Sequence, residues 1–374
     1  MTYDSIIVGA GPAGSHLGYL LANAGLKVAV VDRKIFPREK LCGGLLTTKA
    51  LALLPKPLIA EVPTFAIKSA SVFYNNELVV TLPILSDLQT VRRRDLDDCL
   101  LHAAAGVGCI AYLGLSPTHI NHAKNELTLS DGSILGYYSL FGADGALSTV
   151  RQSIRLPRNT LGFCMEAHVP IDTLQNQDII NNNSIGIYYG EQSKGYAWVF
   201  PTSDSVAIGV GNISNELSEK QIVNSYSAFA SRMLNKNDIK ASAAYLPSGD
   251  SVILGTPVYE NICLLGDAAG LIDPFTGEGI YYAMLSAKKA YEAMVESKHS
   301  KILPKYEQLM APTLLEIQHN VRTRNKIYSP IVLKSTISSM QTAIQYSAKL
   351  INDTIVNYDK PYDEAYYEFK ELMR

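Results

Sequence analysis

The clearest pattern of hydrophobic and polar positions lies at the start of the chain. An apolar run at residues 5–8 meets a glycine-rich turn, and a helical pattern follows from residue 13 to about residue 24. Gly25 ends this pattern, and a second apolar run at residues 27–31 ends on Asp32. Strand, turn, helix and strand in this order predict a βαβ unit with two parallel strands.

Other apolar or alternating runs predict strands and helices further along the chain. In chain order they are paired strands at residues 69–83, a helix at 93–105, a strand meander at 118–143, further strands at 163–211, a buried strand at 262–267, a helix at about 277–295 and helical sequence beyond residue 300. A chain of 374 residues is too long to fold around one ordinary hydrophobic core. These elements therefore predict an α/β fold of two interleaved domains and a smaller helical segment.

Composition and charge exclude several classes of protein. A formal net charge of −2 provides no basic excess, so we expect no nucleic-acid partner. The first strand begins too early to follow a secretory signal, and no apolar stretch approaches the roughly 18 residues of a membrane span. The cysteines form no CxxC pair and no cluster with histidine, so we expect reduced thiols, no metal site and a cytoplasmic protein. They are Cys42, Cys99, Cys109, Cys164 and Cys263.

The glycine turn has the chemistry of a dinucleotide-binding site. Gly9 allows the tight turn after the strand, Gly11 allows a pyrophosphate to approach the backbone, and Gly14 allows the helix to pack on the sheet. The phosphates would meet the helix N-terminus, and Asp32 stands at the spacing of an acid that binds the adenosine ribose. We expect cofactor contacts from Gly9, Gly11, Pro12, Ala13, Gly14, Asp32 and Arg33. The unit by itself does not separate NAD from FAD.

A second motif, Leu264-Leu265-Gly266-Asp267-Ala268-Ala269-Gly270, makes that separation. Together with the N-terminal unit, it resembles the flavoprotein superfamily that contains aromatic hydroxylases and geranylgeranyl reductases. The resemblance implies that Asp267, after Gly266, binds the ribityl chain of FAD. A helix N-cap is the alternative role for Asp267.

Residues 273–280 sharpen the prediction of FAD. Glycines at the start of a helix bring N–H groups to the flavin pyrimidine, where a reduced flavin is negatively charged. We assign this contact to Pro274, Gly277, Glu278, Gly279 and Ile280. Glu278 is expected to act as a partner of the helix dipole rather than as a catalyst.

The same superfamily resemblance implies two supporting residues. Arg93 would lie near the FAD pyrophosphate, and Asp144 would lie in an Asp144-Gly145 loop near the cofactor. Arg92 or Arg94 could be the inward-pointing arginine instead, or all three could form a solvated helix start. Asp144 could hold its loop without touching the cofactor.

Two further motifs resemble the geranylgeranyl reductase family over roughly residues 1–300. The segment Cys42-Gly43-Gly44 is similar to the family's Cys-Gly-Gly element, which approaches the flavin ring on the substrate side, so the resemblance implies a catalytic role for it. The run Tyr196-Ala197-Trp198-Val199-Phe200-Pro201 is similar to the family's Tyr-x-Trp-x-Phe-Pro strand in the substrate cavity. Alternate residues of a strand share a face, so Tyr196, Trp198 and Phe200 would form one aromatic wall ending at Pro201. A packing thiol and an ordinary half-buried strand are the alternatives.

The family resemblance implies an FAD-dependent oxidoreductase that reduces isolated C=C bonds of a polyprenyl, geranylgeranyl-type lipid. We see no second glycine-rich βαβ unit, so we expect NAD(P)H to bind transiently, or a redox protein to donate electrons. A basic run without acids at residues 318–352 predicts peripheral membrane contact or a solvated helix face. Its basic residues are Arg322, Arg324, Lys326, Lys334 and Lys349.

Two other functions remain open for a chain of this fold. The first is an FAD-dependent monooxygenase or halogenase, although Tyr196 departs from the Trp-x-Trp-x-Ile-Pro strand of halogenases. The second is a non-catalytic flavoprotein.

The resemblance also divides the chain into a Rossmann-like FAD-binding domain with an inserted antiparallel β-sheet domain for the substrate. We expect the FAD-binding domain at residues 1–65, 90–155 and 255–300, and the substrate domain at residues 66–89 and 156–254. A C-terminal helical region would follow at residues 301–374.

Overall fold

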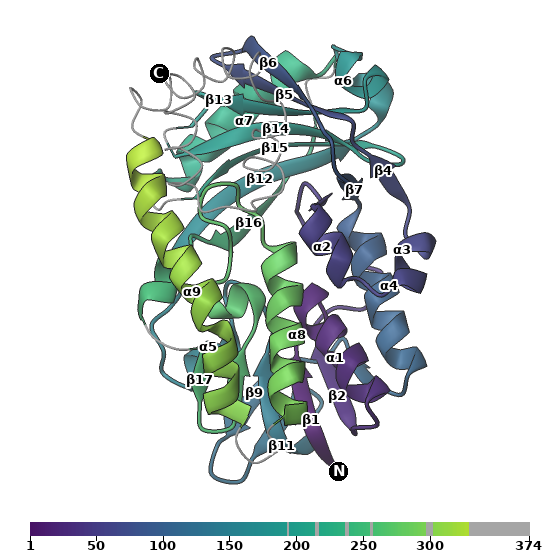
Figure 1. Cartoon of the computed structure of the whole chain (residues 1–374), viewed down its shortest axis with the longest axis vertical. Coiled ribbons are helices and arrows are strands. Elements are labelled where there is room, and N and C mark those ends of the chain that lie inside the picture. The colour runs from purple at the N-terminus through teal and green to yellow at the C-terminus, as the bar shows by residue number, and fades with distance from the viewer. Residues whose placement is uncertain (193, 214–216, 236–238, 255–256, 297–301, 329–374) are drawn as a thin grey trace.

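The computed structural model describes residues 1–328, apart from residues 193, 214–216, 236–238, 255–256 and 297–301. A mostly parallel sheet occupies the lower part of the molecule in Figure 1, and a mostly antiparallel sheet occupies the upper part. The predicted α/β class is confirmed.

The parallel sheet is built around the predicted N-terminal βαβ unit. Its strand order is β17-β18-β11-β1-β2-β8, and the hairpin of β9 and β10 extends it beside β11. Strands β18, β11, β1, β2 and β8 run parallel, whereas β17 pairs antiparallel with β18. The bounds are β1 Thr2–Val8, β2 Val28–Asp32, β8 Ile110–Leu113, β9 Pro117–Asn121, β10 Glu126–Leu129, β11 Ile134–Gly142, β17 Val258–Tyr259 and β18 Ile262–Leu264.

Helices cover the parallel sheet, as expected for strands that are apolar on both faces. Helix α1 (Pro12–Asn23) packs against α4 (Arg93–Gly106) and α8 (Ile280–Glu296), and α8 packs against α9 (Ile302–Ile327). Pro12 stands at the first turn of α1, where no N–H partner is needed. The buried hydroxyl of Tyr306 donates to the carbonyl of Leu264 (2.9 Å), which fixes α9 to the sheet.

The second sheet has the strand order β16-β12-β15-β14-β13-β5-β6. Its pairs are antiparallel except for β13 and β5, which run parallel. The bounds are β5 Ser69–Tyr74, β6 Glu77–Pro83, β12 Leu161–Val169, β13 Ser184–Tyr189, β14 Gly195–Pro201, β15 Val206–Asn212 and β16 Ser242–Pro247. Helix α7 (Glu219–Met233) buries Ile222, Tyr226 and Phe229 against one face. The opposite face carries Cys164, Trp198 and Phe200, which line the cavity described below.

Smaller elements connect the two sheets. Strands β3 (Leu45–Leu46), β7 (Gln89–Val91) and β4 (Thr64–Ala66) form a three-stranded sheet. The short helices are α2 Thr48–Leu53, α3 Lys56–Glu61, α5 Thr149–Ser153 and α6 Asp178–Asn181, and the 3-10 turns are η1 Ile171–Thr173, η2 Asp250–Leu254 and η3 Gly266–Ala269.

Most predicted elements occur where the hydrophobic pattern placed them. The helix predicted from residue 277 begins only at Ile280, because residues 273–279 form a loop in which Asp273 Oδ1 accepts the N–H groups of Phe275 and Thr276 (3.0 and 2.7 Å). No described helix is long and apolar enough to cross a membrane. The domain boundaries stay a prediction, and the C-terminal region is described only as far as residue 328.

Candidate flavin site

A cavity of about 500 Å³ lies between the carboxyl ends of the parallel strands and the face of the antiparallel sheet opposite α7. Segments far apart in the sequence line it, as is usual for ligand sites in open α/β sheets. The predicted site residues that line it are Gly9, Gly11, Pro12, Ala13, Asp32, Arg33, Cys42, Gly43, Arg93, Asp144, Tyr196, Trp198, Phe200, Asp267, Gly277, Gly279 and Ile280.

The other predicted site residues lie behind the cavity lining. A side chain on Gly14 would place its Cβ 1.8 Å from the carbonyl oxygen of Gly9, so Gly14 permits the close packing of helix and turn. Gly44 has a φ of +70°, and a Cβ there would lie 1.9 Å from the carbonyl oxygen of Val91. The N–H of Gly266 donates to Ser286 Oγ (3.0 Å). These glycines support the site through packing.

Pro201, Pro274 and Glu278 also lie outside the lining. The carbonyl of Pro201 accepts the Thr90 hydroxyl, which joins β14 to β7. Glu278 Oε1 accepts the Thr47 hydroxyl (2.7 Å), and burial raises the pKa of Glu278 to about 7. Its side chain therefore bonds to the N-cap residue of α2, behind the cavity lining.

The glycine turn is held open by Asp32. Gly9 has a φ of +103°, and Asp32 Oδ2 accepts the N–H of Ala10 (2.8 Å). Asp32 Oδ1 accepts the N–H of Lys34 (2.8 Å), so the carboxylate ties the turn to the end of β2. A Cβ on Gly11 would meet only Arg38 Nη2 within 4 Å (3.7 Å), so the start of α1 is open to a diphosphate.

Arg38 is a cation of this region that sequence reasoning did not assign. Its Nη2 pairs with Asp97 (3.0 Å), and its Nη1 is buried without a hydrogen-bond partner among the described residues. Arg93 lines the cavity, but Asp97 binds its guanidinium in a bidentate pair (2.8 Å for each bond). Arg92 instead pairs with Glu39 and Asp204. The orphaned nitrogen of Arg38, beside the open helix N-terminus, fits a diphosphate.

Asp267 lies at the other end of the cavity, next to the loop before α8. Its Oδ1 would be 3.4 Å from a Cβ on Gly279, an ordinary van der Waals contact, so the carboxylate lies directly beside the backbone of that loop. Burial raises the pKa of Asp267, whereas Lys40 and Arg93 oppose that rise. Lys40 also lines the cavity and was not predicted. A carboxylate beside open backbone fits a sugar-alcohol chain and a flavin ring.

Asp144 holds its loop, which was one of its two expected roles. Its Oδ2 accepts the N–H of Thr149 (2.6 Å) and the Thr149 hydroxyl (2.8 Å) at the start of α5. Arg151 in α5 donates to the carbonyl of Ala268 (3.2 Å). These bonds join the loop after β11 to the segment that carries Asp267.

The Cys-Gly-Gly segment lies directly on the predicted aromatic wall. Tyr196, Trp198 and Phe200 are alternate residues of β14 that face the cavity. The ring centroid of Trp198 lies 5.9 Å from that of Tyr196 and 6.5 Å from that of Phe200. A Cβ on Gly43 would lie 2.7 Å from a ring carbon of Phe200, so only glycine fits at this contact. The Tyr196 hydroxyl donates to the carbonyl of Thr276, which connects the wall to the loop before α8.

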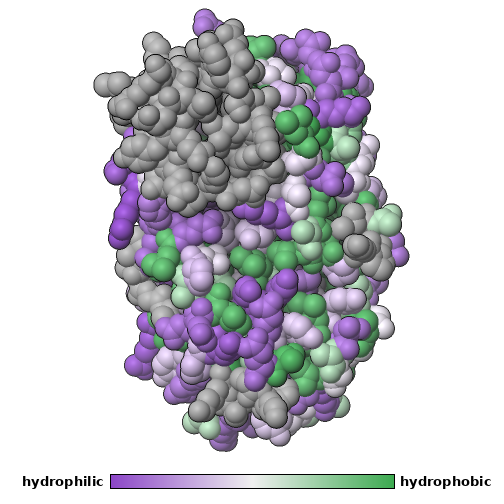
Figure 2. All heavy atoms as spheres, viewed as in Figure 1, coloured by the Kyte–Doolittle hydropathy of each residue, from purple (hydrophilic) through white to green (hydrophobic). Residues whose placement is uncertain are grey.

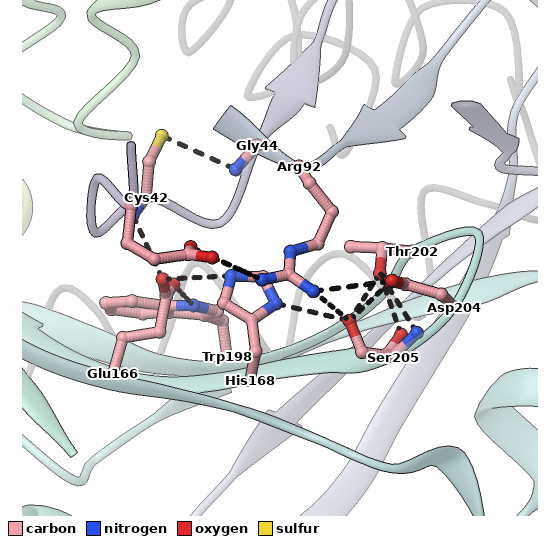
Figure 3. A network of polar contacts seen from close by, with 10 residues as sticks. Cys42, Gly44, Arg92, Glu166, His168, Trp198, Thr202, Asp204 and Ser205 are labelled. Carbon is pink, nitrogen blue, oxygen red and sulfur yellow. Dashed lines mark hydrogen bonds and ion pairs between the residues drawn. The ribbon is translucent and has the colours of Figure 1, made fainter. Parts of the chain in front are cut away.

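Glu166 on β12 joins the two segments from below, as Figure 3 shows. Its Oε1 accepts the N–H of Cys42 (2.9 Å) and its Oε2 accepts Nε1–H of Trp198 (2.8 Å). Sequence reasoning missed Glu166. The signal was an acid in the mostly apolar strand Leu161–Val169, which is unusual unless the acid has buried partners.

Comparisons with known proteins agree with this geometry. The model of the FAD binding domain family matches residues 2–55. A geranylgeranyl diphosphate reductase from Rhodobacter capsulatus is 30% identical over 310 residues, which cover 78% of this chain and 75% of that protein. The chain belongs to the geranylgeranyl reductase family. It is an FAD-dependent oxidoreductase, and FAD is the cofactor that the cavity fits.

Other relatives of this reductase-family chain carry different names. A menaquinone reductase from Mycobacterium tuberculosis is 29% identical over 326 residues, covering 80% of this chain and 78% of that protein. A geranylgeranyl bacteriochlorophyll reductase-like structure from Thermoplasma acidophilum covers 99% of both chains with a TM-score of 0.79 and 20% identity. A flavin-dependent brominase covers 100% of both chains with a TM-score of 0.72 and 17% identity. The fold is thus shared with enzymes of another reaction type.

Proposed function

We propose that this protein reduces isolated C=C bonds in the polyprenyl chain of a geranylgeranyl-type lipid. The observation that carries the proposal is the contact between the Cys42–Gly44 segment and the aromatic wall of β14, at the end of the cavity where Asp267 lies. The relatives named for geranylgeranyl diphosphate and menaquinone support it.

The residues of the aromatic wall suit a substrate that has no polar group beside the reacting bond. An isolated alkene has no carbonyl to polarise, so the protein must position it by shape and exclude water. The buried side chains of Trp198 and Phe200 supply an apolar surface of two rings tilted by 42°, and Tyr196 has its hydroxyl bonded to the carbonyl of Thr276. Aromatic faces also stabilise positive charge that develops on an alkene carbon during protonation.

Cofactor and chain have separate tasks in this reaction. When bound and reduced, FAD would supply the hydride for one alkene carbon, and water would supply the proton for the other. The glycine turn and Arg38 bind the diphosphate, whereas Asp267 and the loop before α8 orient the flavin end. Cys42 and Gly43, which lie on the aromatic wall, help to keep the alkene close to the ring.

We also propose that the electron donor binds transiently, as NAD(P)H or as a redox protein. The described residues contain one glycine-rich βαβ unit, and its helix N-terminus is assigned to FAD. Stopped-flow reduction of the enzyme under NADH, NADPH and a small iron–sulfur protein would identify the donor.

We further propose that access to the lipid involves peripheral contact with an anionic membrane. Arg322 and Lys326 are exposed on α9, and hydrophilic and hydrophobic residues are interspersed over the part of the surface that α8 and α9 form (Figure 2). Arg324 does not belong to such a surface, because it is buried and bonded to Asp250 and to the carbonyl of Ser248. Lys334 and Lys349 lie outside the described residues.

The decisive experiment is anaerobic. The photoreduced enzyme is mixed with geranylgeranyl diphosphate, and flavin absorption is followed while the lipid is analysed by mass spectrometry. We expect the flavin to reoxidise without oxygen and the lipid to gain two hydrogen atoms for each bond reduced. The saturated analogue phytanyl diphosphate is the control and should leave the flavin reduced.

The rival functions give different outcomes. Reoxidation that requires oxygen, with an oxygenated or halogenated product, would show a monooxygenase or halogenase. A flavin that binds but is reduced by no donor, and reoxidised by no lipid, would show a non-catalytic flavoprotein.

A further inference from the structure

Glu166 is a buried carboxyl group whose two oxygens have different partners. Oε1 accepts the backbone N–H of Cys42, which is 124 residues away in the chain, and Oε2 accepts Nε1–H of Trp198. One side chain thereby bonds the Cys-Gly-Gly segment to the centre of the aromatic wall (Figure 3). The cavity lies on the other side of these two partners, and Glu166 does not line it.

The chemistry of the two donors selects the charged form of the carboxyl group. A backbone N–H and an indole N–H can only donate, so both carboxyl oxygens must accept. The ionised form does this with both oxygens and makes two charge-assisted bonds. A protonated carboxyl carries its hydrogen on one of the two oxygens and weakens the bond there. A glutamine would turn an NH₂ group toward one of the two donors.

We propose that Glu166 is a positioning residue, and that its ionised form holds the Cys42–Gly44 segment against Trp198 in the arrangement that places the alkene. Only the expected effect of Glu166 on the rate of alkene reduction rests on the proposed function. The bond between Glu166 and the two segments is independent of the substrate.

Several charged and titratable groups face Glu166. Lys40 and Arg92, from the loop after β2 and the start of α4, favour its charge. Cys164 and His168 flank it on β12, and Tyr226 approaches from α7. Burial outweighs the hydrogen bonds and the cations, and raises the pKa of Glu166 to about 7. The two forms are therefore both populated near neutral pH.

A chain of polar groups connects this buried carboxyl with the surface, as Figure 3 shows. His168 Nε2 lies 3.6 Å from Glu166 Oε1, and His168 Nδ1 lies 3.4 Å from Ser205 Oγ. The Ser205 hydroxyl donates to the exposed Asp204 (2.9 Å), so the neutral ring of His168 can donate from Nδ1 to Ser205, which leaves Nε2 without a proton on the side of Glu166. Burial lowers the pKa of His168 to about 4, so its ring is neutral at neutral pH. None of these polar side chains lines the substrate cavity.

The test uses Trp198, which is the only tryptophan of the chain. Tryptophan emission of the FAD-loaded enzyme is recorded as a function of pH for the wild type, Glu166→Gln, Glu166→Asp and the control Glu292→Gln. Glu292 pairs with Lys289 on α8 and does not line the cavity. The rate of anaerobic flavin reoxidation by geranylgeranyl diphosphate is measured over the same pH range.

We expect a change in emission with a midpoint near pH 7 in the wild type and in Glu292→Gln. Glu166→Gln should lose this change, and Glu166→Asp, which keeps a carboxyl group, should retain one with a shifted midpoint. The wild-type reoxidation rate should fall as the pH drops through the same midpoint. Glu166→Gln should be roughly tenfold to a hundredfold slower and independent of pH in this range, because small misplacements of a reacting group have effects of this size.

Other results would overturn the proposal. An emission change that persists in Glu166→Gln would belong to another group, and a wild-type rate in that variant would remove the positioning role. If Glu166→Gln does not fold, the comparison of the wild type with Glu166→Asp still tests the proposal. Identical midpoints of the emission change in these two proteins, or no emission change in either, would contradict it. An enzyme that shows the emission change but reduces no alkene at any pH would contradict the proposed function alone.

Discussion

Arg38 in the loop after β2 and Asp97 in α4 form an ion pair of 3.0 Å, and Asp97 also binds Arg93 through both of its oxygens. The Asp97 side chain is fully buried, whereas the two arginine side chains are 14% and 10% exposed. One carboxylate thus holds two cations beside the glycine turn.

Replacing Asp97 with asparagine should leave these two arginines without their anion. We expect the free energy of unfolding to fall by about 3 kcal/mol, as is typical when one partner of a buried ion pair is removed. The affinity for FAD should also fall, because Arg38 would lose its position. Thermal denaturation and FAD titration measure the two effects. If the affinity for FAD is unchanged, the position of Arg38 does not matter for binding the diphosphate.

Two alanine substitutions should distinguish folding from cofactor binding in the glycine turn. Gly14→Ala would place a Cβ 1.8 Å from a backbone carbonyl oxygen, so we expect a loss of about 3 kcal/mol or more in the free energy of unfolding. Gly11→Ala meets only the end of Arg38, so the fold should persist while the diphosphate is blocked. Circular dichroism and flavin absorption report these outcomes. A yellow Gly11→Ala protein would argue against a diphosphate at this turn.

The stability of the protein should respond to the titration of Glu278. Because its folded-state pKa is raised to about 7 from 4.5, its contribution to stability is present below pH 4.5 and is lost as the pH rises through about 7. Glu278→Gln cannot lose a proton, so its free energy of unfolding should gain up to about 3 kcal/mol relative to the wild type as the pH rises from 4.5 to 7. Urea unfolding at several pH values measures this difference, with Glu292→Gln as the control. A difference that stays constant with pH would contradict the raised pKa.

Arg322 and Arg324 form a matched pair for testing membrane contact. Arg324→Ala should lower the free energy of unfolding by about 2 kcal/mol, because it removes buried bonds to Ser248 and Asp250. Arg322→Ala should leave stability unchanged and weaken sedimentation with phosphatidylserine vesicles at low salt. Vesicle binding that is insensitive to Arg322→Ala and to salt would oppose the proposed contact.

Much of the flavin site could be predicted from local sequence. The turn from Gly9 to Gly14, the strand end at Asp32 and the wall of Tyr196, Trp198 and Phe200 follow from spacing along one segment, because helices and strands repeat with fixed periods. These residues line one cavity in the structure. Gly14 is the exception, because its role is to let the helix approach the turn.

The sequence by itself determined the βαβ unit and the strand that carries the aromatic residues, since each depends on neighbours within one turn or one strand. The prediction of FAD came from the resemblance of two distant motifs, at Gly9–Gly14 and Leu264–Gly270, to a flavoprotein superfamily. Only the tertiary structure decided that Arg38 pairs with Asp97, that Glu278 bonds to Thr47, and that Glu166 bonds to Cys42 across 124 residues. A buried polar group needs a partner, but its residue type does not reveal which distant segment provides one. That choice is made when the two sheets pack around the cavity.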